Sequence, residues 1–169
     1  MSDRLTSDRP LNDRPRNGQA TSDRARTVPK PVPKATPVSR PFWDAAAAGE
    51  LHIQRCSGCG EHVFYPRRFC PHCGSPDLAW VRASGRAVLD SYVISHVSGP
   101  GFADEVPYVI AIVRLEEGPR MLSRLAGVAP DPAVLELDMP LLVGFEPRGE
   151  MAVPVFHPAE SLRPAGDAA

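Results

Sequence analysis

Four cysteines are the residues of this sequence with the clearest capacity for chemistry. Cys56 and Cys59 form one Cys-x-x-Cys pair, and after ten intervening residues Cys70 and Cys73 form a second pair. Each pair can deliver two sulfur atoms from one tight turn, and zinc takes four tetrahedral ligands with thiolate sulfurs at about 2.3 Å. The spacing therefore predicts one zinc ion held by Cys56, Cys59, Cys70 and Cys73.

The predicted metal is expected to be structural, because four thiolates leave no position open for water or substrate. Gly60 and Gly74 directly follow the two pairs, and glycine suits a turn that needs a positive φ. Two other interpretations stay open: a dithiol redox pair, and iron bound by the same four sulfurs. His52, His62 and His72 lie beside or within the pairs, and we expect them to be surface or turn residues.

The rest of the sequence carries no recognised catalytic pattern. With all four cysteines at the metal, no thiol is left for acyl transfer, and no lysine follows Lys34. The G-x-S-x-G, Walker, G-x-G-x-x-G and H-E-x-x-H motifs do not occur. His96, Asp90 and Asp104 have no partner at a meaningful spacing. We therefore expect a chain that is not an enzyme and has no catalytic residue.

The elements that position the cysteines are expected to be small. Pro41 near the start and Gly49 at the end of an alanine-rich run predict a short helix. We assign residues 41–52 to this helical segment and residues 53–81 to a zinc ribbon. The spacer between the pairs is shorter than usual, but it can hold a small hairpin through residues 63–65.

The sequence after the cysteines favours strands. Runs rich in Val, Ile, Leu and aromatic residues alternate with turn signals rich in Gly and Pro, and no amphipathic helix of ordinary length lies between them. Such short strands suit a small closed barrel, because closure removes exposed edges. We assign residues 82–159 to this barrel. Its five expected strands span residues 87–97, 108–115, 120–128, 141–146 and 151–156.

The first forty residues differ from the remainder in composition. Seven of the 20 prolines fall in residues 1–41, and residues 1–40 carry nine Lys or Arg against four Asp. Few apolar side chains are present to offset the entropy of ordering the chain. We therefore expect a disordered Pro/Arg-rich tail and solvated linker over residues 1–40, and a second short tail over residues 160–169.

Charge and hydropathy narrow the classes of partner and compartment. Residues 41–169 carry ten Arg against sixteen Asp or Glu, and an acidic folded region repels the phosphate backbone of nucleic acids. No stretch approaches the roughly 20 apolar residues of a membrane span, and the N-terminus lacks the apolar core of a secretory signal. We expect a cytoplasmic protein, where reduced cysteines favour metal binding over disulfides.

The segment 41–159 resembles a bacterial and archaeal family of zinc-ribbon and OB-fold proteins, formerly a domain of unknown function and found beside thiolases. The motifs that carry the resemblance are Phe42-Trp43-Asp44, Gln54 to Gly60, Tyr65 to Ser75, Trp80, Ser84-Gly85, Val106-Pro107-Tyr108, Glu117 to Arg120, Met139-Pro140 and Val153 to Phe156. Two positions depart from the family: relatives often have an amide residue at Arg124 and a glycine at Asp138. The resemblance implies a mainly β protein with a short N-terminal helix, a rubredoxin-like ribbon and a five-stranded OB-fold barrel.

The resemblance also implies a function in lipid metabolism, within a hetero-oligomeric protein complex. Family members assemble with thiolase-like enzymes, and some are linked to MaoC-like hydratases. We therefore expect an accessory subunit that bridges such a partner and shapes the path of an acyl-CoA. Arg114, Arg120 and Arg124 are candidates for CoA phosphates, since guanidinium groups bind phosphate bidentately, although ordinary ion pairs are the alternative. Phe42 and Trp43 are candidates for the partner interface.

Two other functions compete with this expectation. A free-standing acyl-CoA-binding protein would use the same barrel without an enzyme partner. A nucleic-acid-binding module is the second, because OB-folds and zinc ribbons both occur in such proteins. The acidic folded region disfavours the nucleic-acid module, so the sequence predicts no nucleic-acid partner and no membrane partner.

Overall fold

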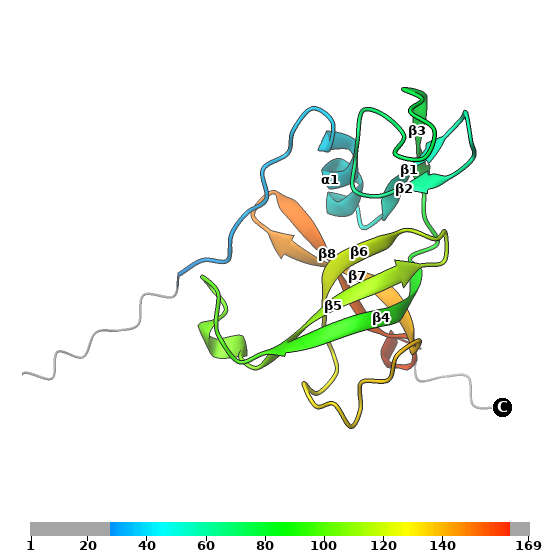
Figure 1. Cartoon of the computed structure of the whole chain (residues 1–169). Coiled ribbons are helices and arrows are strands. Elements are labelled where there is room, and N and C mark those ends of the chain that lie inside the picture. The colour runs from blue at the N-terminus through cyan, green and yellow to red at the C-terminus, as the bar shows by residue number, and fades with distance from the viewer. Residues whose placement is uncertain (1–27, 163–169) are drawn as a thin grey trace, which may run out of the picture.

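The computed structural model describes residues 28–162 and shows a mainly β protein with one α-helix. The helix α1 and the small β1–β3 sheet lie on one side of a barrel built from β4 to β8 (Figure 1). The elements are α1 (Arg40–Ala47), β1 (His52–Cys56), β2 (His62–Val63), β3 (Leu78–Arg82), β4 (Arg86–Ser95), η1 (Ala103–Glu105), β5 (Tyr108–Leu115), β6 (Arg120–Leu125), β7 (Pro140–Arg148), β8 (Met151–Pro158) and η2 (Ala159–Leu162).

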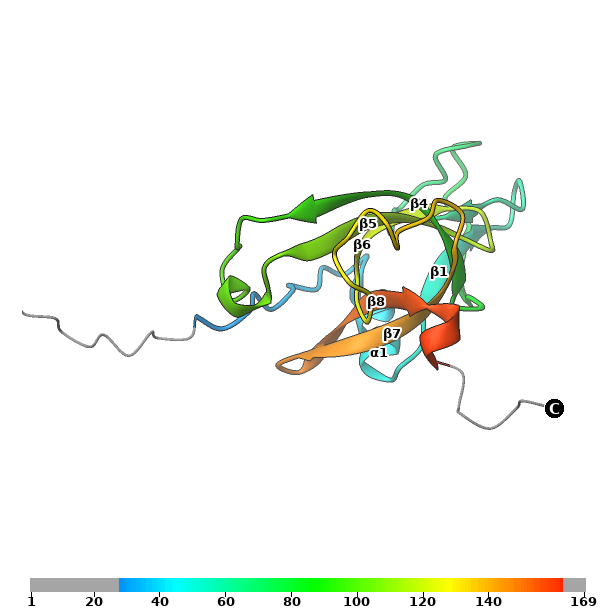
Figure 2. The same ribbon diagram turned by 90° about the horizontal axis from the view of Figure 1, so that it is seen from below.

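The five predicted strands form a closed barrel in the order β4-β5-β6-β8-β7. Every pairing is antiparallel except β6 with β8, which meet in parallel at the single pair Leu125 and Phe156. Figure 2 shows β4, β5 and β6 along one wall of the barrel, and β7 and β8 along the other. The strand β5 has the predicted bounds, and its alternate residues face inward and are buried: Val109, Ala111, Val113 and Leu115.

The ribbon is a three-stranded sheet in the order β2-β1-β3. The strands β1 and β3 were not predicted, and the expected hairpin within the spacer is wrong. Only His62 and Val63 form a strand there, and they pair with β1 on the other side of the first cysteine pair. The reason is long-range pairing: all five residues of β1 are matched with β3 more than 20 residues away.

The helix, the ribbon and the barrel share one core. Phe42 of α1 and Ile53 of β1 pack with buried barrel residues such as Leu89 and Phe156. The predicted end of the helix is confirmed at Gly49, which has φ +78° directly after the last turn. The helix is shorter than the segment 41–52, because it ends at Ala47.

The linker over residues 28–39 differs from the solvated tether that its composition predicts. The ammonium of Lys30 lies 2.9 Å from a carboxylate oxygen of Glu146 on β7, so electrostatic attraction holds this part of the chain against the barrel. Residues 1–27 and 163–169, which hold most of the predicted tails, lie outside the described residues. Within residues 28–162, no helix is long and apolar enough to cross a membrane.

Candidate metal centre and barrel surface

The two cysteine pairs sit in two turns of the same design. The N–H of Gly60 donates to the carbonyl of Cys56, and the N–H of Gly74 donates to the carbonyl of Cys70, both at 2.9 Å. Both glycines have positive φ, of +80° and +77°, as their position after each pair predicts. Each turn is therefore closed by a residue that accepts the left-handed backbone without steric cost.

The sulfur atoms of the two turns face one another. The Sγ atoms of Cys56 and Cys73 are 3.6 Å apart, as are those of Cys59 and Cys70. All four Sγ atoms lie within 4.8 Å of one another. A tetrahedron with metal–sulfur bonds of about 2.3 Å has sulfurs separated by about 3.8 Å. The geometry thus fits one tetrahedral ion, as the spacing predicts.

The thiols of this cluster titrate unequally. Backbone hydrogen bonds, the largest of them from the N–H of Cys59, lower the pKa of Cys56 to about 7. For Cys59, the backbone N–H of Glu61 lowers the pKa, but partial desolvation of the thiol and its hydrogen bonds with the three neighbouring cysteines outweigh it and raise the value to about 12. Four thiolates at this separation repel one another, so a bound dication is what would let all four ionise.

Gln54 supports the metal centre structurally, a role that its sequence position did not predict. It is the one polar side chain buried in the described core, at 5% exposure. Its amide nitrogen donates to the carbonyl of Arg67 at 3.0 Å, and its oxygen accepts the Arg67 N–H at 2.7 Å. These bonds tie β1 to the spacer and so position the second cysteine pair. The sequence His52-Ile53-Gln54-Arg55-Cys56 is mixed in polarity and gave no local signal of this role.

The histidines near the cysteines do not join the cluster. Within residues 28–162, the group of potential metal ligands at this site contains only the four cysteines. The Nε2 of His52 instead lies 2.9 Å from a carboxylate oxygen of Glu50. The ion would therefore be held by sulfur alone and closed to substrate.

Arg114 and Arg120 lie directly opposite each other on β5 and β6. Like charges in this position repel, and Asp90 offsets the repulsion. Asp90 occupies an irregularity in β4, and its carboxylate lies 2.8 Å from Arg120 Nε and 3.5 Å from Arg114 Nε. The hydrogen bond from Arg120 lowers the pKa of Asp90. Arg114 also contacts Asp138 at 2.8 Å.

Arg124 lies in a second ion-pair network, at the other end of the same strands. Its guanidinium pairs with Glu105, and it contacts Glu146 at 3.0 Å. Burial raises the pKa of Glu146, but hydrogen bonds from Arg148 and Lys30 and the charge of Arg124 lower it to about 2. Each of the three arginines predicted to meet CoA phosphates thus has a carboxylate partner in the structure. Their binding to CoA stays a prediction.

The two residues predicted for a partner interface are placed differently. Phe42 is 5% exposed and belongs to the core, whereas Trp43 is half-buried. Both line a groove of about 390 Å³ between α1, the ribbon and the barrel. Tyr65 and Leu122 also line the groove and are 51% and 54% exposed. The N–H of Leu122 donates to the Tyr65 hydroxyl at 3.2 Å, so a side chain caps β6 where β8 does not pair with it.

The backbone conformation of Asp138 bears on one of the two departures from the family pattern. Asp138 has φ +60°, the only positive value among the non-glycine residues of the described chain. This backbone conformation favours glycine, which is the residue expected at that position in relatives. Its carboxylate gains the ion pair with Arg114 in exchange.

The fold and the metal centre together define a zinc-ribbon and OB-fold protein. Its metal centre is structural, because four sulfur ligands leave no position for a substrate. Comparison with known families agrees: residues 43–79 match the rubredoxin-like zinc ribbon domain of ChsH2, and residues 80–146 match its C-terminal OB-fold domain. The chain belongs to this family, which also carries the name DUF35. The predicted family, fold class and structural zinc are thereby confirmed.

Two curated relatives and one solved structure indicate the range of the family. A probable enoyl-CoA hydratase alpha subunit of Thermomonospora curvata is 42% identical over 120 residues, which are 70% of this chain and 37% of the relative. A DUF35 domain-containing scaffold protein of Methanocaldococcus jannaschii is 35% identical over 78 residues, which are 46% of this chain and 55% of the relative. The chain thus spans about half or less of the length of these curated relatives.

A solved structure gives the broadest coverage of the three. The chain superposes on a chain of an Ltp2-ChsH2(DUF35) aldolase with a TM-score of 0.67 and 38% identity. The match covers 76% of this chain and 99% of that one.

Proposed function

We propose that this chain is a non-catalytic accessory subunit of an enzyme complex that processes acyl-CoA thioesters. The observation that carries the proposal is the similarity to the chain from the Ltp2-ChsH2 aldolase, which this chain covers over 99% of its length. The names of the other relatives, a hydratase alpha subunit and a scaffold protein, point to the same kind of role. In this proposal the partner supplies the reacting groups.

The chemistry of the described residues supports an accessory role. All four cysteines of the chain lie in the sulfur cluster, so a thiol for acyl transfer has to come from another protein. Asp90, one of the few acidic residues on a barrel strand, is engaged by two arginines, and hydrogen bonding holds its pKa low. A carboxylate held in this way is a poor general base near neutral pH.

The partner we propose is a thiolase-like enzyme or a MaoC-like hydratase, in a cytoplasmic hetero-oligomer. The barrel would bridge this partner and shape the acyl-CoA path. Trp43 is the stronger of the two candidates for contact with the partner, because Phe42 is buried in the core of this chain. Arg114 and Arg120 are the better placed of the three arginines for phosphate, because their side chains are 44% and 64% exposed, against 24% for Arg124.

Affinity purification of the tagged chain from its own host tests the proposal. Wild-type chain and two variants, Trp43→Ala and Leu137→Ala, are compared by mass spectrometry of the co-eluting proteins. Leu137 is 62% exposed and does not line the groove beside Trp43, so it controls for loss of any exposed apolar side chain. We expect an enzyme of acyl-CoA metabolism with wild type and Leu137→Ala, and less of it with Trp43→Ala. A wild-type chain that elutes alone contradicts the proposal.

A solitary acyl-CoA-binding protein is the second candidate. A cavity of about 350 Å³ lies where β4 and β7 pair, with apolar walls from Leu115, Leu141 and Leu142. Arg86 and Arg114 line the same cavity, and among residues 28–162 Arg86 has no carboxylate within ion-pair distance. Titration of the purified chain with acetyl-CoA, monitored by calorimetry, distinguishes the two candidates: tight binding without any enzyme partner favours the solitary binder.

A further inference from the structure

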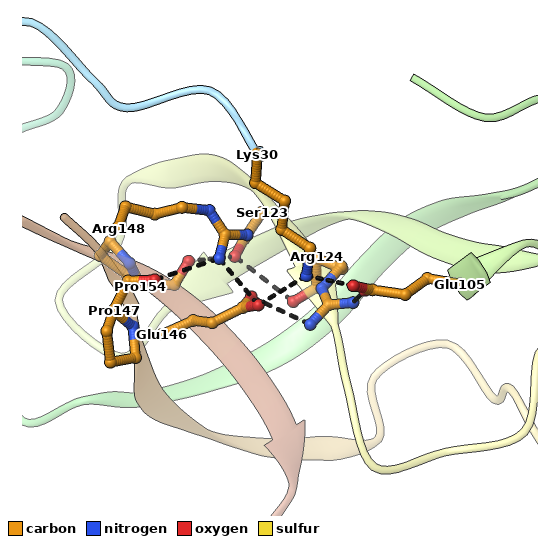
Figure 3. A network of polar contacts seen from close by, with 8 residues as sticks. All are labelled: Lys30, Glu105, Ser123, Arg124, Glu146, Pro147, Arg148 and Pro154. Atoms are coloured by element: carbon orange, nitrogen blue, oxygen red, sulfur yellow. Dashed lines mark hydrogen bonds and ion pairs between the residues drawn. The ribbon is translucent and has the colours of Figure 1, made fainter. Parts of the chain in front are cut away.

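The linker before α1 passes through a notch between two loops of the barrel. One wall of the notch is the β4–β5 connection, which contributes Phe102 and Glu105, and the other is the end of the β7–β8 hairpin, which contributes Glu146. Figure 3 shows the Lys30 side chain extending from the linker toward Glu105, Arg124 and Glu146. We call Phe102, Glu105 and Glu146 the lysine notch.

The notch surrounds the ammonium group of Lys30 with favourable partners. Lys30 Nζ lies 2.9 Å from Glu146 Oε1 and also pairs with Glu105. The same atom lies 4.7 Å from the centroid of the Phe102 ring, within the range of a cation–π contact. The Lys30 side chain is 20% exposed, so water screens these charges less than it would on an open surface.

The backbone of the linker also fits the notch closely. A Cβ atom at Gly101 would lie 2.6 Å from the Cα and from the N of Lys30, which no side chain can do without displacing the linker. On the opposite wall, a Cβ at Gly149 would lie 3.6 Å from a methyl group of Val32. Gly101 therefore leaves room for the main chain at Lys30, and a side chain there would fill that room.

Two arginines hold the carboxylates in place. Arg124 pairs with both Glu105 and Glu146, and so links the two walls. Arg148 lies 2.9 Å from Glu146 Oε1, the oxygen that also contacts Lys30. With the positions of both carboxylates fixed, the ammonium of Lys30 enters a prearranged site and little order has to be gained on binding.

We propose that the lysine notch is a binding site for the chain's own linker, and that Lys30 acts as a latch. The latch joins the β4–β5 connection to the β7–β8 hairpin and keeps residues 30–39 on the surface of the barrel. Lys34, four residues further on, lines the groove beside Trp43, so the latch also fixes one wall of that groove. This inference does not depend on the proposed function.

Limited proteolysis with trypsin measures whether the latch is closed. Trypsin does not cleave before proline, so Lys30-Pro31 is resistant and Lys34-Ala35 is the cleavage site that follows it in the linker. When opening is fast, the rate of cleavage reports the population of the open form. Loss of charge-assisted hydrogen bonds should raise that population about tenfold.

Lys30→Gln removes the charge, and Lys30→Arg keeps it. We expect cleavage after Lys34 to be about tenfold faster than wild type in the full-length zinc-loaded Lys30→Gln protein. Arginine at position 30 creates a site still followed by Pro31, so cleavage after Lys34 remains the readout, and it should stay within about twofold of wild type. Gly101→Ala should open the latch by a different route, through the clash with the Lys30 backbone.

Neutralising an acid outside the notch controls for a charged residue replaced elsewhere on the surface. Glu136→Gln changes an exposed carboxylate on the loop before β7, and we expect it to leave cleavage unchanged. Thermal unfolding of every variant verifies that the barrel is intact. Cleavage of Lys30→Gln and Gly101→Ala at the wild-type rate overturns the proposal. An acceleration shared equally by Glu136→Gln overturns it as well, because the effect would then not depend on the lysine notch.

Discussion

Replacing Cys59 with serine removes one metal ligand with little loss of packing. Cys59 is exposed, whereas Cys56 and Cys70 are buried in the small core of the ribbon. A structural zinc site contributes about 10–16 kcal/mol in small domains. If the four equivalent thiolates share this roughly equally, the loss is about 3 kcal/mol, or a zinc affinity on the order of 100-fold weaker.

The end of the ribbon that carries the cysteines has few other means of support, whereas Ile53 of β1 packs in the core shared with the barrel. Besides its cysteines, its separate core contains only Val63 and the half-buried Leu78, and burying such a side chain contributes about 1.5–3 kcal/mol. We therefore expect zinc loss to disorder the end of the ribbon that carries the cysteines. Trp80 of β3 reports this change, because its near-ultraviolet circular dichroism depends on a fixed environment.

The assay combines competitive zinc titration with circular dichroism on wild type, Cys59→Ser and Ser57→Ala. Ser57 is exposed in the same turn and is not a ligand, so its alanine variant should bind zinc as wild type does. Cys59→Ser with unchanged zinc affinity and an unchanged Trp80 signal would refute the assignment of the four-sulfur site. Iron instead of zinc in protein from the native host would change the identity of the metal and leave the ligand set intact.

Three further predictions concern stability. Gln54→Ala leaves both backbone groups of Arg67 without partners and should lower the free energy of unfolding by about 1–3 kcal/mol, with weaker zinc binding; urea denaturation and zinc titration measure both. Gly85→Ala should cost about 2 kcal/mol, because φ is +76° and its Cβ would lie 2.7 Å from Val143 Cγ1; equal stability by urea denaturation would contradict the close approach. Because the pKa of Glu146 is lowered from 4.5 to about 2, its ionised form stabilises the fold above pH 4.5, and this contribution is lost as pH falls toward 2. The difference in stability between wild type and Glu146→Gln should narrow across that window, and a constant difference would contradict the pKa shift.

The parts of the fold that the sequence predicted are those encoded locally. The cysteine pairs and their glycines lie within a few residues of each other, so the metal site could be predicted with its ligands. The strand β5 (Tyr108–Leu115) is a run rich in Val and Ile that is followed by the turn signal over residues 116–119, and its bounds were predicted from that composition and punctuation. Gly49 ended the predicted helix for a similarly local reason.

The parts that were missed depend on partners distant in sequence. The strand β1 is short and mixed in polarity, and it is a strand because β3 pairs with all five of its residues. The predicted strand over residues 120–128 ends at Leu125, because Ala126 donates to Phe156 of β8 and Gly127 turns the chain at φ +70°. Lys30 was assigned to a solvated linker, since its acid partners at positions 105 and 146 are adjacent only in the folded chain.

Native mass spectrometry of the tagged chain, isolated from its host at its natural level, tests the accessory-subunit account most directly. The account predicts a complex in which the 18.3 kDa chain carries one zinc ion and is joined to an enzyme that acts on acyl-CoA. The account would be contradicted if the chain were found only at its own mass plus zinc. In that result no enzyme subunit is bound under any salt condition that preserves protein complexes.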